Sequence, residues 1–100
     1  MGKNDFAAQV YEFVKKIPRV KVTTYGQIAQ ALGKPKSSRA VGNILHHNLS
    51  VKVPCHRVVN KEGRLAFNFA HGGIKKQREI LLKEGVKFKD KLHVILGKDA

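Results

Sequence analysis

The chain has 100 residues, of which 42% are hydrophobic and 27% charged, a balance that excludes a disordered chain and favours one globular domain over 1–100. Twenty Lys and Arg residues against seven Asp and Glu residues give a formal net charge of +13, which indicates nucleic acid as partner before an anionic membrane surface. No apolar run approaches the roughly eighteen residues of a membrane span, and a single cysteine excludes an intramolecular disulfide.

The first segment is predicted to form a helix. Asp5 can cap its N-terminus, and Pro18 marks its end. Apolar residues recur at helical spacing between them, at Phe6, Val10, Phe13, Val14 and Ile17. After Pro18, the segment 20–22 alternates like a short strand or an extended link.

Two further helices are predicted in the next segment. Thr24 and Gln27 have the spacing of a capping box, so a second helix is expected to begin there and to end at Gly33. After the link 34–36, Ser37 or Ser38 can cap a third helix, from Arg39 to about His47.

This pair of short helices matches the helix-turn-helix pattern, in which the second helix enters a groove of DNA. Ala40 and Gly42 are small enough to let the backbone of that helix approach a partner closely, and they leave Arg39 as the protruding side chain. Ser38 and Asn43 belong to the same predicted surface. The positive charge has an alternative interpretation, as a solubility feature or the lysine-rich surface of a thermophile's protein. The prediction of DNA binding therefore depends on the motif and the charge together.

The second half of the chain predicts a small β-hairpin and a last helix. After 51–53 and the cysteine motif, the segments 58–59 and 64–67 are expected to form this hairpin, with a turn at 60–63. The last helix is expected from Ile74 to Glu84, followed by a basic C-terminal tail at about 88–100. The predicted fold is α/β and mostly helical, a single winged-helix-like domain.

The cysteine lies in a segment, 53–59, that reads Val-Pro-Cys-His-Arg-Val-Val. A cysteine reacts as its thiolate, and His56, Arg57 and Lys52 are candidates for a base and a positive field near Cys55. The alternative is that Cys55 is a small buried apolar residue, as free cysteines often are. The histidines lack the paired spacing of a zinc finger, so no metal site is predicted.

With the segment 54–58, the chain resembles the C-terminal domain of the O6-alkylguanine-DNA alkyltransferases, suicidal DNA repair proteins. The segments 22–29, 39–42 and 81–85 are similar to that family's helix-turn-helix entry, recognition-helix start and closing helix. These four blocks occur in the family's order, over about 6–86. The resemblance implies a monomer without cofactor that acts on double-stranded DNA containing O6-alkylguanine. With neither a membrane span nor a signal peptide in the sequence, the expected location is the cytoplasm of a prokaryote or the nucleus of a eukaryote.

The resemblance also implies roles for the residues of the cysteine motif. Cys55 would accept the alkyl group, and His56 would take the thiol proton through a water. Glu84 would orient His56, and Asn48 would brace the loop before the cysteine. The thioether formed cannot be reversed, so the protein would be consumed by one reaction.

DNA binding is implied for a second set of residues. Base flipping is required, because a stacked O6 substituent cannot reach a buried thiolate. Arg39 would fill the gap left by the flipped base, and Tyr25 would crowd the target phosphate. Residues of the segment 40–45 would line the minor groove. The implied DNA-binding residues are Ser38, Ala40, Gly42, Asn43 and Arg57, with Tyr25 and Arg39.

The pocket for the alkylated guanine is the least defined part of the resemblance. Val53 and Pro54 precede the cysteine and are expected to line it. The segment 65–73 is longer than its family counterpart, and its candidates for contact with the base are Asn68, Phe69 and His71.

Two other functions remain open from the sequence. The shortness of the chain is typical of alkyltransferase-like proteins, which bind alkylated guanine without repairing it and have lost the cysteine. Cys55 is present here, which favours transfer. A basic helix-turn-helix protein without a role in damage is the third candidate, and it would show sequence preference instead of preference for an alkylated base.

Overall fold

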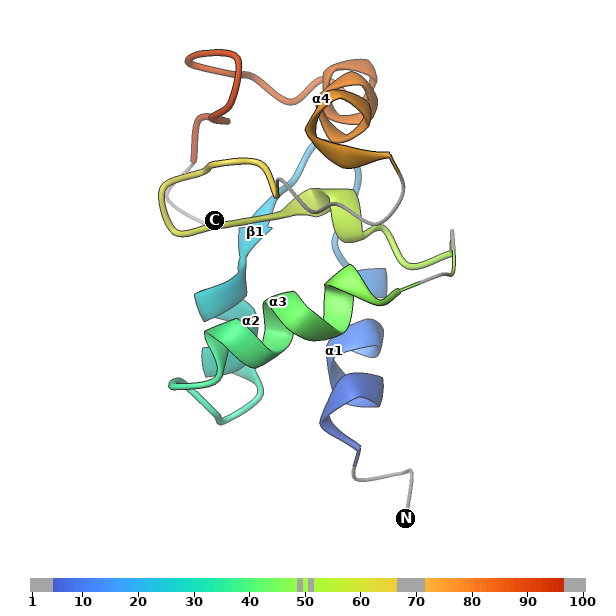
Figure 1. The fold of residues 1–100 in the computed structure, drawn as a ribbon, viewed down its shortest axis with the longest axis vertical. Coiled ribbons are helices and arrows are strands. Elements are labelled where there is room, and N and C mark those ends of the chain that lie inside the picture. Colours follow the sequence, from blue (N-terminus) through green and yellow to red (C-terminus); the bar gives the residue numbers. More distant parts are fainter. Residues whose placement is uncertain (1–4, 49, 51, 67–71, 97–100) are drawn as a thin grey trace.

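The computed structural model describes residues 5–48, 50, 52–66 and 72–96. In chain order the elements are α1 (Phe6–Lys15), β1 (Thr23–Thr24), α2 (Tyr25–Ala31), α3 (Ser38–His46), the 3-10 turn η2 (Cys55–Arg57), β2 (Val58–Val59) and α4 (Gly73–Lys83). Figure 1 shows α1, α2 and α3 in one half of the molecule and α4 in the other, with β1 between them. The predicted class, a mostly helical domain with a short sheet, is confirmed. No helix in the described ranges is long and apolar enough to span a membrane.

Local capping fixes where the first two helices begin. The Asp5 side chain accepts a hydrogen bond from the Ala7 N–H at 2.9 Å. At α2, the Thr24 hydroxyl accepts from the Gln27 N–H and the Gln27 side chain accepts from the Thr24 N–H, both at 3.1 Å. Both predicted caps are therefore confirmed, because each satisfies backbone donors that lack a partner within the helix.

The predicted helix pair is present, with small shifts at its ends. Gly33 follows the end of α2, the first helix of the pair, in a left-handed conformation, at φ +80°, that glycine adopts without strain. The second helix begins at Ser38, and Ser37 occupies its N-cap without a side-chain hydrogen bond. Val41 and Leu45 face the core, whereas Arg39 is exposed. The geometry expected of a helix-turn-helix motif is thus in place.

The sheet differs from the predicted hairpin. The turn at 60–63 forms, and the Asn60 N–H donates to the Arg64 carbonyl at 3.1 Å. Val58 and Val59, however, pair in parallel with Thr23 and Thr24, and not with the described residues 64–66. Both valines are buried, one on each face of the strand, and a strand buried on both faces is typical of parallel pairing.

The C-terminal segment expected as a basic tail folds back on the domain. Lys89 and Ile95 donate backbone hydrogen bonds to His93 and Lys87 at 3.0 and 2.9 Å, which makes 87–95 a hairpin, called here the C-terminal hairpin. Backbone bonds join it to 63–65, from the Leu65 N–H to the Leu92 carbonyl and from the Val94 N–H to the Gly63 carbonyl, both at 2.9 Å. The segment 60–64, which contains the turn and is called here the turn 60–64, is therefore joined to the C-terminal hairpin.

Two apolar clusters meet at β2. One joins α1, α2 and α3 with Cys55 and Val58, and the other joins α4 with Val59 and Val94. Neighbouring residues of a strand point to opposite faces, so Val58 and Val59 enter different clusters. Cys55 is therefore part of the first cluster, close in the chain to the strand at which the two clusters meet.

We expect Leu81→Ala to lower the free energy of unfolding by about 3 kcal/mol, because Leu81 is fully buried and its truncation leaves a cavity. Leu82 is 45% exposed, so Leu82→Ala is the matched control and should cost less than about 1 kcal/mol. Urea denaturation of the two variants measures both values. Equal losses would contradict the placement of α4.

Candidate active site

Cys55 begins a tight turn that directs its side chain inward. Its N–H donates to the Val53 carbonyl at 2.8 Å, and Pro54 precedes the turn without a donor of its own. The cysteine is 6% exposed and contacts the first apolar cluster. The structure thus brings Val53, Pro54 and Cys55, all named from the sequence, to one buried turn.

Asn48 braces this turn from the end of α3. Its amide group donates to the carbonyls of Ser50 and Val53 at 3.0 and 3.3 Å, and its oxygen accepts from the Ser50 N–H at 3.0 Å. The same amide nitrogen lies 3.6 Å from the Cys55 sulfur. Asn48 is 3% exposed, so these contacts satisfy a buried polar group that would otherwise be costly.

Burial governs the state of the thiol. It raises the pKa of Cys55 above its ordinary value, although the hydrogen bonds from Asn48 and from the backbone act in the opposite direction. The positive field expected from Arg57 and Lys52 does not activate the resting thiol. Cys55 is therefore protonated at neutral pH, and a base must remove its proton when it reacts.

Glu84 binds two neighbours of the cysteine at once. Its Oε2 lies 2.8 Å from His56 Nε2. Arg57 donates to both carboxylate oxygens, from Nε at 3.0 Å and from a terminal nitrogen at 2.9 Å. The other terminal nitrogen of Arg57 donates to the Ile17 carbonyl at 2.7 Å. These contacts form one network, called here the Glu84 network, that joins α4, η2 and the segment after α1.

Arg57 occupies a different place from the one expected. The sequence analysis assigned it to DNA, but its side chain is 15% exposed and its donors bind Glu84 and Ile17 inside the protein. An arginine that makes a two-pronged contact with a carboxylate fixes that carboxylate in position. In the free protein, Arg57 is thus part of the site's internal support.

The Glu84 network also controls the charge of the carboxyl group. Burial alone raises the pKa of Glu84, but the hydrogen bonds from Arg57 and His56 outweigh it, and the pKa is lowered overall. Glu84 is the C-cap of α4, where a negative charge is unfavourable to the helix dipole. The two partners offset that cost.

Tyr25 lies near the same buried sulfur. Burial raises the pKa of its hydroxyl, and the charge of a Cys55 thiolate raises it further. Its ring packs on Gly42, where an added Cβ would lie 3.7 Å from the ring carbons. Tyr25 therefore stays a neutral hydrogen-bond donor at physiological pH, held between α2 and α3.

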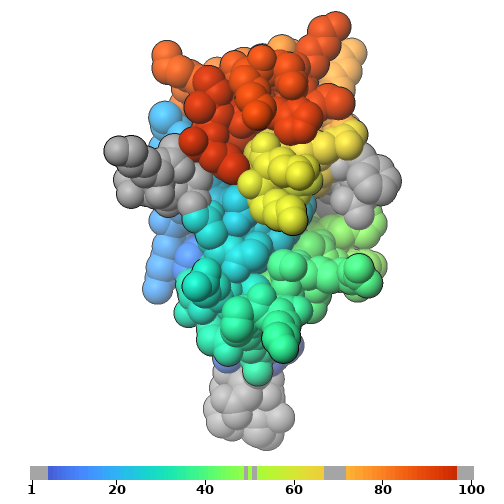
Figure 2. Space-filling view, turned by 90° about the vertical axis from the view of Figure 1, so that its left-hand side faces the viewer, coloured from blue at the N-terminus to red at the C-terminus, as the bar shows by residue number. Residues whose placement is uncertain are grey.

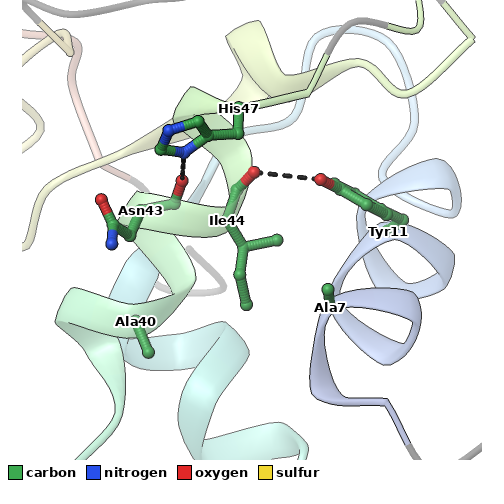
Figure 3. A pocket seen from close by; sticks show the side chains of 6 residues that line it. All are labelled: Ala7, Tyr11, Ala40, Asn43, Ile44 and His47. Carbon is green, nitrogen blue, oxygen red and sulfur yellow. Dashed lines mark hydrogen bonds between the residues drawn. The ribbon is translucent and has the colours of Figure 1, made fainter. Parts of the chain in front are cut away.

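The residues predicted to contact DNA on α3 lie outward. Ser38, Arg39, Ala40 and Asn43 are exposed. Ala40 and Asn43 also line an open hollow of about 350 Å³ between α3 and α1, together with Ala7, Tyr11, Ile44 and His47 (Figure 3). The Tyr11 hydroxyl donates to the Ile44 carbonyl at 3.1 Å, which joins the two helices. This hollow contains no acidic or basic side chain other than an imidazole, so the candidate chemistry lies elsewhere, at Cys55.

Three predicted pocket residues, Asn68, Phe69 and His71, lie outside the described residues. Among the described residues, no group of three His, Cys, Asp or Glu side chains could hold a metal ion.

Gln77 is a residue of the site region that sequence analysis missed. It is fully buried on α4, where its amide group donates to the carbonyls of His56 and Val58 at 3.0 and 3.3 Å. Its oxygen accepts from the Ala66 N–H at 2.9 Å. A glutamine on the apolar stripe of the helix was the available signal, because a buried amide requires partners of this kind.

Comparison with known proteins agrees with the resemblance seen in the sequence motifs. A family model described as the DNA-binding domain of 6-O-methylguanine DNA methyltransferase matches residues 5–86. Alkyltransferase-like protein 1 of Schizosaccharomyces pombe is 38% identical over 87 residues, which cover 86% of this chain and 81% of the relative. The methylated-DNA–protein-cysteine methyltransferase of Shigella flexneri is 38% identical over 85 residues, which cover 84% of this chain and 48% of the relative.

The crystal structure of S. pombe Atl1 in complex with damaged DNA containing O6-carboxymethylguanine superposes with a TM-score of 0.78 at 34% identity. That match covers 94% of this chain and 90% of the other. The chain therefore spans most of the alkyltransferase-like relative but about half the length of the methyltransferase.

The lowered pKa of Glu84 predicts how stability depends on pH. A carboxylate whose pKa is lowered by folding stabilises the protein fully above its ordinary value of 4.5, and this contribution is lost as the pH falls through the lowered pKa. We expect Glu84→Gln to reduce the free energy of unfolding by about 3 kcal/mol at pH 7, since it leaves Arg57 buried without its counterion.

Urea denaturation between pH 3 and pH 7 checks this expectation. The difference between wild type and Glu84→Gln should shrink below about pH 4.5. Glu79→Gln, which alters an exposed pair with Lys76 at 3.8 Å, is the control and should show little difference at any pH. A gap for Glu84→Gln that stays constant with pH would contradict the Glu84 network.

Proposed function

The chain belongs to the O6-methylguanine-DNA methyltransferase family through that family's DNA-binding domain, and we propose that it repairs DNA by transferring the alkyl group of O6-alkylguanine to Cys55. The observation that carries this proposal is a buried thiol directly beside His56, whose ring Glu84 holds at 2.8 Å. A nucleophile, an adjacent base and a group that orients the base are what such a transfer requires.

In this proposal the duplex binds along α3. The exposed side chain of Arg39 at the start of α3 enters the base stack in place of the flipped guanine. Exposed small residues beside it, such as Ala40, allow the helix backbone to approach the minor groove. Because Cys55 is buried, the guanine must leave the stack to meet it. The alkyltransferase-like relative crystallised with DNA containing O6-carboxymethylguanine supports the same partner.

The Glu84 network supports His56 as the base. When Nε2 of His56 carries the proton that points at Glu84, Nδ1 carries a lone pair and can accept a proton. Glu84 stays ionised at neutral pH, so it also stabilises the imidazolium that forms. The proton of the Cys55 thiol passes to His56 through a water.

The transfer step then balances in atoms and electrons. The thiolate sulfur of Cys55 forms a bond to the alkyl carbon, and the bond between that carbon and O6 breaks. The electron pair of that bond goes to O6 of the guanine. The guanine takes up one proton and the thiol has lost one, so the protons balance. The thioether has no leaving group that would regenerate the thiol, so each molecule reacts once.

A damage sensor that binds O6-alkylguanine without transfer is the second candidate. One observation favours it: the structure of the alkyltransferase-like protein Atl1 in complex with damaged DNA superposes on this chain with a TM-score of 0.78. Cys55 favours transfer, because His56 follows it directly and the His56 ring contacts Glu84 at 2.8 Å.

The mass of the protein distinguishes the two candidates. After incubation with a duplex that carries one O6-methylguanine, we expect wild type to gain about 14 Da, the mass of a methylene, on the peptide that contains Cys55. Cys55→Ala should gain nothing but keep its preference for the damaged duplex, and an undamaged duplex is the control. No gain in wild type, with that preference intact, would replace repair by sensing.

We expect His56→Gln to lower the rate constant of methyl transfer at saturating DNA by about a hundredfold or more, because the base is lost. The affinity for undamaged duplex should not change. His93→Gln is the matched control, since His93 also contacts a carboxylate, Asp90, at 2.9 Å, but outside the site. Single-turnover kinetics measure the rates, and an unchanged rate for His56→Gln would exclude it as the base.

A further inference from the structure

The C-terminal hairpin carries positive charge that the proposed transfer does not use. Lys87, Lys89 and Lys91 are exposed, and none of them forms an ion pair with a residue in the described parts of the chain. Alternation along the strand turns Phe88 toward the protein, where it packs on the second apolar cluster. The same alternation turns the lysines on either side of it outward.

The hairpin is held in place at several points. Its backbone pairs with 63–65, so the charges of Lys61 and Arg64 on the turn lie beside it. The guanidinium carbon of Arg78 on α4 lies 5.5 Å from the centre of the Phe88 ring. A basic surface on a fixed backbone loses less entropy on binding than one on a disordered tail.

Few acidic side chains oppose this charge. The turn 60–64 and the hairpin contain five Lys or Arg residues against Glu62 and Asp90, a formal net charge of +3. The Asp90 carboxylate accepts a hydrogen bond from the Leu92 N–H at 2.9 Å, and it lies 2.9 Å from Nδ1 of the His93 ring. Its charge is therefore directed at the hairpin's own turn, and the lysines face solvent.

The location of this surface points to a partner. Figure 2 shows the C-terminal hairpin (orange-red) and the turn 60–64 (yellow) on the same face as the connection between α2 and α3 (teal to green). The yellow turn lies between the other two segments in this view. The matched DNA-binding domain ends at residue 86, so the hairpin lies beyond it.

We propose that the C-terminal hairpin and the turn 60–64 bind backbone phosphates of the duplex held by the helix-turn-helix motif, outside the base pairs that α3 contacts. This proposal rests on the proposed function only in that α3 binds the duplex. Lysines act as point charges on phosphates and read no sequence, so the surface adds affinity equally to damaged and undamaged DNA.

The test measures the affinity of Lys87→Gln/Lys89→Gln/Lys91→Gln for an undamaged duplex as a function of salt. Each lost phosphate contact should reduce the slope of log affinity against log salt by about 0.9, so a total reduction of about 2 to 3 is expected. Lys15→Gln/Lys16→Gln/Lys21→Gln removes the same charge from exposed positions at and after the end of α1 and should change the slope by less than about 1.

A second measurement locates the contact. In duplexes that carry one uncharged methylphosphonate linkage at a time, some linkages should weaken binding of wild type and leave the hairpin variant unaffected. With Cys55→Ala as the background, so that no methyl transfer consumes the lesion, the ratio of affinities for O6-methylguanine and undamaged duplexes should be equal with and without the three hairpin substitutions.

Two results would overturn the proposal: equal slopes for the hairpin and control variants, or a changed damage ratio in the hairpin variant. Because the slopes use undamaged DNA, they are independent of whether Cys55 is methylated. Either proposal can therefore fail while the other stands.

Discussion

The carboxylate of Glu84 is the group on which the candidate site depends, because two residues that follow the cysteine bind it at once. Its position at the end of α4 is unfavourable to the helix dipole, and its burial is costly. The contacts from His56 at 2.8 Å and from Arg57 at 2.9 and 3.0 Å offset both costs. Arg57 extends the network to the Ile17 carbonyl, so the His56 ring is fixed relative to both halves of the domain.

In the proposed transfer, the burial of the thiol and the base beside it have complementary effects. A buried thiol with a raised pKa is protonated at rest, so it is a poor nucleophile toward small electrophiles in solution. The same burial makes the adjacent base necessary. Asn48 and Tyr25 belong to the surroundings of the sulfur. The amide nitrogen of Asn48 lies 3.6 Å from it, and the nearby Tyr25 hydroxyl is neutral because burial raises its pKa. On this account, the reactive state arises when a flipped guanine occupies the site.

Local signals in the sequence predicted local structure well. The Asp5 cap, the Thr24–Gln27 capping box and the left-handed Gly33 depend on residues within a few positions of one another. The parallel pairing of β1 and β2 depends on burial of a strand by segments distant in the chain, and no periodicity over two residues could predict it. Sequence named Cys55, His56, Glu84 and Asn48. It could not tell that the Arg57 side chain is only 15% exposed and binds Glu84, or that Gln77 joins three segments.

In the proposed function, the Glu84 network supports the chemistry at Cys55, and exposed cations hold the protein on DNA. The transfer depends on a flipped alkylguanine that meets residue 55. A crystal structure of Cys55→Ser bound to a duplex with one O6-methylguanine shows whether it does. We expect the guanine outside the stack, Arg39 in the gap, and the methyl carbon within about 3.5 Å of the serine oxygen. A guanine that stays stacked, or a flipped base whose methyl group points away from residue 55, would contradict the proposed transfer.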